Sequence, residues 1–495
     1  MDEYKEMSII KTIHQIPFAA LGMGAAFTIL WGVADTVAAH AEVKTYTGVG
    51  KCTMGDLVTP AQAKNYAREM AMQNAKEQAG VYLASYTSVA NTKLTAKEIT
   101  AISNNITEVV GDVTYTQTAG EVNGMPVVVY TATLQANVDT EGIRKYLAKA
   151  ETERAAIVRQ DETMQKDLKD SLTRIEKLNE QYQRAESEEK KEQISREYSE
   201  ADRKLLAVQK MEEGNARYYK GDYQGAIAAF DEALSLDPKY SSAYNNRSCA
   251  YSKLGRYDRA IEDCNEALAI DAKDAVAYYN RGGLYYDKGD NDRAIADYDK
   301  AISLNSKYFE AYNNRGNAYA HKGNYTHAIS DYSRALVLNP DFSIAYYNRG
   351  SAYIDTGEYD RAIADFDRAL ALSPKNADVY YDRGLAYDGK GDFDRAIADY
   401  SQALALDPKD VKAYINRGNA YLHKGDNDSG IADYNAALAI DPEDPNAYYD
   451  RALAYARNGD YDQAMADCRK ALELNPDDAN AKVLMQRIEE AESGD

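Results

Sequence analysis

Residues Ala311 to Pro340 read AYNNRGNAYAHKGNYTHAISDYSRALVLNP, and this unit decides the fold because the chain repeats it from about residue 207 onward. One glycine recurs at a constant interval of 34 residues: Gly221, Gly255, Gly289, Gly323, Gly357, Gly391, Gly425 and Gly459. A period of 34 residues is typical of a solenoid whose repeats are pairs of helices. We number each repeat from 1 to 34 so that this glycine stands at position 15, which makes Ala207 the first residue of repeat 1.

The spacing of residues within the unit predicts two helices. Tyrosine recurs at positions 4 and 11, as in Tyr312 and Tyr319, and a small residue recurs at position 8, as in Gly316. These offsets place the three residues on one face of a first helix. The second helix keeps a small-large-small spacing, as in Ala362, Phe366 and Ala369. The glycine at position 15 ends the first helix with little steric cost.

The unit resembles the tetratricopeptide repeat family, and the resemblance covers about 290 of the 495 residues. It implies a mainly α fold, namely a right-handed solenoid of eight helical hairpins over residues 207–478. A capping helix and tail follow in residues 479–495. In front of the solenoid we expect a long helix and a small α+β domain.

Two features depart from the family pattern. Position 7 carries arginine and position 23 carries aspartate in seven repeats, and we predict that they form an ion pair between the two helices of each repeat. The predicted pairs include Arg281 with Asp297, Arg315 with Asp331 and Arg349 with Asp365. Repeat 1 instead places Lys210, Glu213 and Arg217 where the family has apolar residues, so its first helix is expected to be the end of the preceding long helix.

Positions 2, 5, 6, 9, 12 and 13 fall on the other face of the first helix, which lines the concave side of the solenoid in this family. Position 6 carries Asn246, Asn280, Asn314, Asn348 and Asn416, and position 5 carries Tyr279, Tyr347, Tyr381 and Tyr449. An asparagine side chain both donates and accepts hydrogen bonds, so a row of them is suited to an extended peptide backbone. Some tetratricopeptide repeat proteins are known for such a row. The alternative is that these asparagines bond the neighbouring helix and were copied by duplication.

Charge narrows the class of partner. The chain has a formal net charge of -21, which argues against nucleic acid because its phosphates would be repelled. Acidic residues on the expected concave face predict a polypeptide partner that carries lysine or arginine: Asp287, Glu310, Asp355, Asp378, Asp382 and Asp388.

Motifs for catalysis, cofactors and metals are absent from the sequence. No metalloprotease, nucleophile-elbow or phosphate-loop pattern occurs. His321 and His423 share position 13 but lie three repeats apart, so one rigid array does not bring them to a single ion. The sequence predicts a non-enzymatic protein without a cofactor or a metal.

Residues 1–41 are typical of an export segment. Two lysines precede the uncharged stretch of residues 17–34, and Ala39-His40-Ala41 provides a cleavage site. The alternative is an uncleaved anchor, since about 18 apolar residues are close to the length that spans a bilayer. The chain is therefore expected to be exported to the periplasm or cell envelope of a bacterium, and to meet a membrane only through this segment.

Residues 42–147 predict an α+β domain. Strands are expected near residues 44–51, 109–117 and 127–138, the last two joined by a hairpin at Asn123-Gly124. Residues 60–83 predict a helix with alanine at every fourth position. The order of these elements resembles a domain shared by some bacterial outer-membrane lipoproteins and a flagellar assembly protein.

Residues 148–206 predict a long helix. Apolar residues at heptad spacing, among them Met164, Leu168, Ile175 and Leu178, are consistent with a coiled coil that forms a homodimer. The alternative is a single helix packed on the first repeat.

Two functions are consistent with these observations. The first is a non-enzymatic scaffold of the bacterial envelope that binds an extended polypeptide in the concave groove. The second is a structural envelope or surface protein that associates with itself.

Overall fold

The computed structural model describes residues 43–54, 60–89, 107–122, 125–139 and 164–493. The chain divides into two compact units, Met1–Glu42 and Val43–Asp495. The predicted export segment lies in the first unit, outside the described residues. No helix among the described residues is long and apolar enough to cross a membrane.

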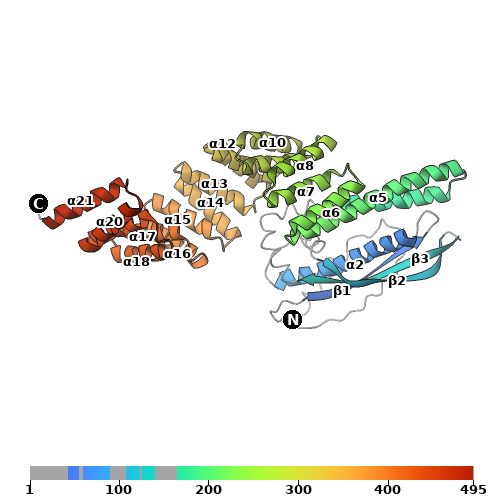
Figure 1. The fold of residues 1–495 in the computed structure, drawn as a ribbon, viewed down its shortest axis with the longest axis horizontal. Helices are drawn as coiled ribbons and strands as arrows, with labels where there is room; N and C mark the ends of the chain where they lie inside the picture. The colour runs from blue at the N-terminus through green and yellow to red at the C-terminus, as the bar shows by residue number, and fades with distance from the viewer. Residues whose placement is uncertain (1–42, 55–59, 90–106, 123–124, 140–163, 494–495) are drawn as a thin grey trace, which may run out of the picture. The chain divides into compact units, whose positions relative to one another are not determined.

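The α+β region is a three-stranded antiparallel sheet with one helix across a face (Figure 1). The strand order is β1 (Val43–Met54), β3 (Met125–Asp139) and β2 (Thr107–Val122). β2 and β3 pair as consecutive antiparallel strands with Val122 opposite Met125, as the sequence predicts, and the turn residues Asn123-Gly124 lie outside the described residues. Helix α2 (Pro60–Val89) buries its alanine face: Ala63, Ala67, Ala71, Ala75 and Ala79. Small residues at this spacing let the helix backbone approach its neighbours closely, as the sequence predicts.

The prediction of one long helix over residues 148–206 is wrong. A helix covers residues 164–183, the chain turns at 184–187, and α5 (Glu188–Tyr219) begins. The Ser187 side chain accepts a hydrogen bond from the Lys190 backbone N–H, and Glu188 and Glu189 occupy the first turn of α5. A serine cap followed by acidic residues favours a new helix start at this point.

The two helices bury the predicted heptad seam between themselves and α2. Ile175 and Leu178 share one core cluster with Ile194, Leu205 and the alanine face of α2. Arg174 pairs with Glu197 across the hairpin at 2.5 Å. Because residues of this chain already cover the seam, it is not free for a coiled coil with a second copy.

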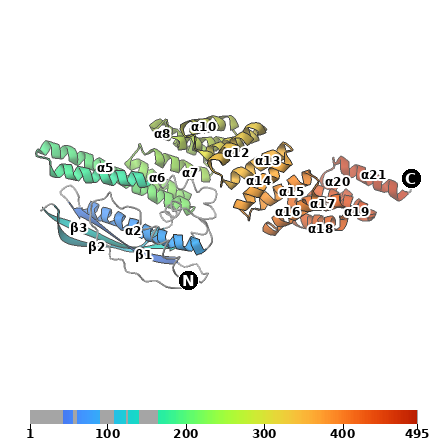
Figure 2. The same cartoon turned by 180° about the vertical axis from the view of Figure 1, so that it is seen from behind.

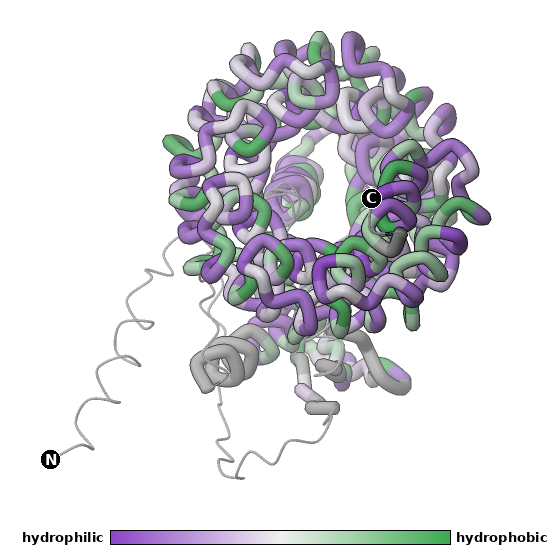
Figure 3. Tube along the Cα trace, turned by 90° about the vertical axis from the view of Figure 1, so that its left-hand side faces the viewer, coloured by the Kyte–Doolittle hydropathy of each residue, from purple (hydrophilic) through white to green (hydrophobic). Residues whose placement is uncertain are grey.

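The structure confirms the solenoid of helix pairs, which follow one another around a common axis (Figure 3). Long helix α5 supplies the first helix of repeat 1, as expected, and the remaining helices alternate between first and second positions (Figures 1 and 2). They are α6 (Tyr223–Leu236), α7 (Ser241–Lys253), α8 (Tyr257–Ile270), α9 (Ala275–Asp287), α10 (Asn291–Leu304), α11 (Phe309–His321), α12 (Tyr325–Leu338), α13 (Ser343–Asp355), α14 (Tyr359–Leu372), α15 (Ala377–Gly389), α16 (Phe393–Leu406), α17 (Val411–Lys424), α18 (Asn427–Ile440), α19 (Pro445–Asn458), α20 (Tyr461–Leu474) and α21 (Ala479–Ser493). The eight repeat glycines have φ between +69° and +85°, a backbone conformation that only glycine adopts at little cost.

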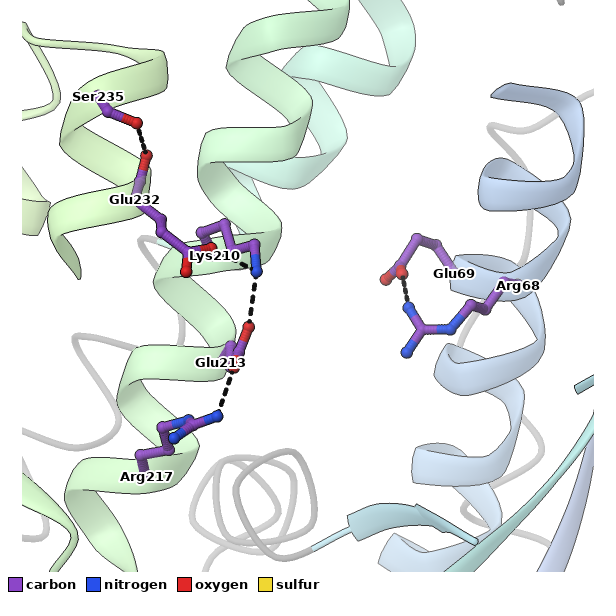
Figure 4. Close-up of polar contacts among 7 residues, drawn as sticks. All are labelled: Arg68, Glu69, Lys210, Glu213, Arg217, Glu232 and Ser235. Atoms are coloured by element: carbon purple, nitrogen blue, oxygen red, sulfur yellow. Dashed lines mark hydrogen bonds and ion pairs between the residues drawn. The ribbon is translucent and has the colours of Figure 1, made fainter. Parts of the chain in front are cut away.

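In repeat 1, charged residues stand at positions where the family has apolar residues, and they form an ion-pair network (Figure 4). Lys210 on α5 lies 3.1 Å from Glu213 on the same helix and 2.6 Å from Glu232 on α6. Glu213 in turn pairs with Arg217 at 2.8 Å. The network joins the two helices of repeat 1 and accounts for its departure from the family pattern.

A three-way arginine contact joins each repeat to the one before it. In repeat 5, Arg349 donates from Nε and Nη2 to both carboxylate oxygens of Asp365, each at 2.7 Å. Its Nη1 donates to Ser333 Oγ of the preceding repeat at 2.8 Å. The same bidentate geometry occurs in all seven repeats with this arginine: Arg247, Arg281, Arg315, Arg349, Arg383, Arg417 and Arg451. The aspartates are buried, so the planar guanidinium fixes the relative position of three helices.

The third contact is absent from our sequence prediction. Its acceptor stands at position 25 of the preceding repeat and is always a short polar residue: Asp231, Asn265, Asp299, Ser333, Asp367, Ser401 or Asn435. The recurrence of Asp, Asn or Ser at position 25 is the sequence feature from which this contact could have been predicted. Each arginine also lies 5.3–5.8 Å from the ring of the tyrosine at position 4. That distance is within the range of cation–π attraction.

Candidate functional site

The first helices of repeats 2 to 4 line a cavity of about 640 Å³. Its walls include residues at the positions that the sequence assigns to the concave face, among them Ser242, Cys249, Val276, Asn280 and Tyr286. Met164 and Asp167, from the helix before α5, also line it. The cavity is therefore a concave surface made from successive repeats, as expected for this arrangement of helices.

Tyrosines and amides give the cavity a mixed lining. Tyr218, Tyr219, Tyr240, Tyr279, Tyr286, Tyr298 and Tyr308 contribute rings. The Oδ1 atom of Asn245 is buried in the wall and has no hydrogen-bond partner in the described part of the chain, while its Nδ2 donates to Asp274 at 2.7 Å. Amphipathic rings beside an unfilled acceptor suit a ligand that has apolar parts and N–H donors, such as a peptide.

Four of the five predicted asparagines use their amide donors between repeats. Asn314 Nδ2 donates to the Tyr279 hydroxyl at 2.9 Å, and Asn416 Nδ2 donates to the Tyr381 hydroxyl at 2.8 Å. Asn348 Nδ2 donates to Asn313 Oδ1 at 3.0 Å, and Asn246 Nδ2 donates to Asn215 Oδ1 at 2.7 Å. Most of these contacts join position 6 to position 5 of the preceding repeat. They favour the structural alternative for these side chains.

Asn280 differs from the other members of the row. It lines the cavity, and its side chain forms no hydrogen bond with any residue that the structure describes. Tyr279, Tyr347, Tyr381 and Tyr449 are all half-buried on the same face. Of these four tyrosines, Tyr279 lines the cavity, and asparagines of the next repeat donate to the hydroxyls of two, Tyr279 and Tyr381.

Asn314→Ala should destabilise repeats 3 and 4 by about 1 kcal/mol or more, because the Tyr279 hydroxyl loses its donor and Asn313 Nδ2 loses its acceptor, Asn314 Oδ1. Asn280→Ala is the matched control, since it removes the same side chain from position 6 without removing a hydrogen bond. We expect thermal unfolding to show a lower Tm for the Asn314 variant and an unchanged Tm for the Asn280 variant. Equal changes in both would show that the inter-repeat bond contributes nothing.

Acidic groups on this face are shifted toward their neutral forms. Burial raises the pKa of Asp287. Burial also raises the pKa of Asp382, and the negative charges of Asp378 and Asp355 raise it further. Burial also raises the pKa of Asp450 to about 6, opposed by a hydrogen bond from Asn419 and assisted by Asp444 and Asp478. Desolvated carboxylates of this kind gain from a nearby positive charge.

The raised pKa of Asp450 predicts that the stability of the fold depends on pH. Its pKa is higher in the folded chain than the ordinary value of 3.8, so ionisation destabilises the fold above about pH 6. That destabilisation disappears as the pH falls through 6 toward 3.8. Asp450→Asn should therefore raise the Tm at pH 7 and leave it unchanged near pH 4, as measured by thermal unfolding across this range. A Tm gain of equal size at both pH values would contradict the assignment.

Comparisons with known proteins identify the repeat. Family models described as tetratricopeptide repeat match residues 211–275, 381–445, 418–489, 309–342 and 332–364, and one described as TPR repeat matches 282–323 and 350–391. The chain belongs to the tetratricopeptide repeat family. The N-terminal resemblance to envelope lipoproteins has no counterpart in these matches and stays a prediction.

Several solved structures are similar to parts of the chain. MamA is 33% identical and matches over 33% of this chain and 95% of its own, with a TM-score of 0.32. YrrB, described as a TPR protein with an unusual peptide-binding site, is 24% identical over 38% of this chain and 96% of its own, with a TM-score of 0.33. The hetero-tetramer Cut9-Hcn1 of the APC/C is 19% identical over 61% of this chain and 60% of its own, with a TM-score of 0.40. The match thus spans less than two thirds of the Cut9-Hcn1 chain. No curated protein sequence matches this chain.

Proposed function

We propose that this protein is a non-enzymatic scaffold whose concave face binds an extended polypeptide. Tetratricopeptide repeats support a role in protein–protein interaction. The observation that carries the finer proposal is the cavity of about 640 Å³ formed by successive first helices, with its tyrosine rings and the unfilled acceptor of Asn245. No group of three His, Cys, Asp or Glu side chains that could hold a metal ion lies in the described residues.

The tyrosines rather than the asparagines make the contacts in this proposal. The amide groups of Asn314 and Asn416 are already used to orient the hydroxyls of Tyr279 and Tyr381. An oriented tyrosine provides a rigid ring with few rotatable bonds and one hydroxyl, so it loses little conformational entropy on binding. The bound polypeptide is expected to carry basic residues, because the groove lining is acidic.

Selection of a phage-displayed library of random dodecapeptides on the full chain tests this function. The wild-type protein should enrich peptides, and Asn280→Trp, which fills the cavity, should not. Lys300→Trp is the control because Lys300 is exposed on α10, a second helix of its repeat, and does not line the cavity. Circular dichroism checks that both variants fold. Enrichment of the same peptides by all three proteins would contradict binding in the groove.

We further propose that the protein acts in the bacterial envelope after export, on the grounds of the segment at residues 1–41. In a bacterial host, mass spectrometry of the purified protein should find a mature chain that starts at Glu42. A chain that retains residues 17–34 and fractionates with membranes would instead support the anchor. Self-association through the coil has lost its main support, since residues of the same chain cover the seam.

A further inference from the structure

One buried tyrosine hydroxyl on the concave side lacks the partner that its counterparts have. Position 24 is tyrosine in repeats 3, 4, 6 and 7, and in repeats 4 and 7 its hydroxyl donates to an asparagine at position 9 of the first helix. Tyr332 donates to Asn317 Oδ1 at 2.8 Å, and Tyr434 donates to Asn419 Oδ1 at 2.6 Å. In repeat 6 position 9 is Leu385, which offers no acceptor.

Tyr400 is consequently left with an unfilled hydroxyl. The residue is fully buried, at 0% exposure, and the structure gives its hydroxyl no hydrogen-bond partner among the described residues. Its ring lies 5.8 Å from the ring of Tyr381 on α15. A buried polar group without a partner is costly, so a ligand that supplies the partner gains free energy at such a group.

Asp388 presents a second unfilled atom beside it. Asp388 lies three residues after Leu385 on α15, hence on the same helix face, and its Oδ1 is buried with no partner in the described part of the chain. Burial raises the pKa of Tyr400, and after burial the largest contribution comes from the charge of Asp388. Repeat 6 therefore contains a buried hydroxyl and a buried carboxylate oxygen that both lack a partner among the described residues.

Three further carboxylates, Asp355, Asp378 and Asp382, stand at positions of repeats 5 and 6 that the sequence assigns to the concave face. Asp382 accepts a hydrogen bond from Ser351 Oγ at 3.2 Å and one from the Tyr347 hydroxyl. Burial raises the pKa of Asp382, and the neighbouring charges of Asp378 and Asp355 raise it further. None of these carboxylates forms an ion pair with a lysine or arginine among the described residues. Burial raises the pKa of Asp388, and His423 opposes that rise. The negative charge here is uncompensated.

The spread of these groups decides which cation fits. The carboxylates do not converge on one point as a metal site requires, and the described residues contain no group that could hold a metal ion. They come instead from several turns of two neighbouring helices, α13 and α15, with the rings of Tyr347 and Tyr381 among them. A guanidinium has five donors in one plane and also stacks on aromatic faces, so it can serve several spread acceptors at once.

We propose that Asp355, Asp378, Asp382, Asp388 and Tyr400 form a subsite for an arginine side chain of the polypeptide bound in the groove, a proposal that rests on the proposed function. The guanidinium donates to Asp382 or Asp378 at the surface. Toward the interior it donates to Oδ1 of Asp388 and to the hydroxyl oxygen of Tyr400. Binding gives the Tyr400 hydroxyl oxygen and Asp388 Oδ1 a hydrogen-bond donor, and it places a positive charge beside the carboxylates.

The test repeats the dodecapeptide selection on the full-length wild-type chain and on the Asp355→Asn/Asp378→Asn variant. Both of these residues are exposed, so the variant should fold like the wild type. We expect arginine to be enriched at one peptide position on the wild-type protein and not on the variant. A selected peptide is then synthesised with arginine, lysine or the neutral isostere citrulline at that position, and the Kd of each is measured by calorimetry. The citrulline peptide should bind wild type at least about 10-fold more weakly than the arginine peptide, and the variant should discriminate much less.

Tyr400→Phe tests the buried part of the subsite. It should lower the preference for arginine over citrulline severalfold and leave the affinity for the citrulline peptide unchanged. An unchanged arginine preference, with or without a lower Tm, would show that the Tyr400 hydroxyl does not contact the bound arginine, which removes it from the subsite.

The outcomes separate this subsite from the scaffold function. Peptides selected without arginine enrichment, or with the same enrichment on both proteins, would overturn the subsite and leave the scaffold function intact. Equal affinity for the arginine and lysine peptides would overturn the assignment to arginine. Failure of both proteins to select any peptide would instead contradict the proposed function itself.

Discussion

Arg349→Leu should destabilise repeats 4 and 5 by about 3–5 kcal/mol, the largest effect that we expect from a single substitution in the solenoid. The arginine donates two hydrogen bonds to Asp365 and one to Ser333, and its loss leaves the buried Asp365 carboxylate, 6% exposed, without a cation. Because repeat arrays unfold locally rather than as one unit, hydrogen exchange followed by mass spectrometry of peptides from α13 and α14 is the appropriate measurement.

Two control variants separate the parts of this contact. Arg349→Leu/Asp365→Leu removes both charges and should cost much less than the single change, since no unpaired charge stays buried. Ser333→Ala removes only the contact to the preceding repeat and should cost about 1 kcal/mol. A double variant that is as unstable as the single one would contradict the account of a buried, mutually dependent pair.

Gly282→Ala should destabilise the solenoid by about 1–3 kcal/mol, although alanine favours helices more than glycine does. A Cβ at this position would lie 2.9 Å from Cε1 of the Tyr298 ring and 3.3 Å from the carbonyl oxygen of Ala294. The small residue at position 8 is therefore required by the ring at position 24, which packs directly on the backbone of the first helix. Thermal unfolding should show a lower Tm.

The adjacent glycine provides a matched control for this effect. A Cβ at Gly283 meets only the Tyr298 hydroxyl oxygen, at 3.7 Å, an ordinary contact distance. Gly283→Ala should therefore raise the Tm through better helix propensity, by up to about 1 kcal/mol of stability. If both substitutions stabilised the protein, the close packing at position 8 would not be limiting.

The repeat architecture follows from the sequence because its signals are periodic and local. A helix-ending glycine every 34 residues fixes the length of each unit, and a small residue at position 8 with an aromatic at position 24 fixes how its two helices pack. The pairing of positions 7 and 23 follows in the same way, because an arginine and an aspartate on facing helices have few alternative partners.

Other features depend on which neighbour covers a surface, and sequence spacing does not contain that information. The heptad pattern of residues 164–182 predicts a buried seam, but the partner is α5 of the same chain, because Ser187 caps a new helix. An asparagine at position 6 suits a peptide backbone and a neighbouring repeat equally well, since it both donates and accepts. The unfilled Tyr400 hydroxyl depends on Leu385 at position 9, and this is evident only by comparison with the bonds of Tyr332 and Tyr434 to asparagines at that position.

Photo-crosslinking tests the central claim, that the concave face of the first helices binds a polypeptide, most directly. A photoreactive phenylalanine derivative is placed at Ser252, which lines the cavity, or at Lys300, which is exposed on α10, in the full chain. A selected dodecapeptide is added and the covalent products are measured by mass spectrometry. We expect crosslinks from position 252 that excess unlabelled peptide suppresses, and none from position 300. Crosslinks from position 300 alone would show that the polypeptide binds elsewhere on the solenoid.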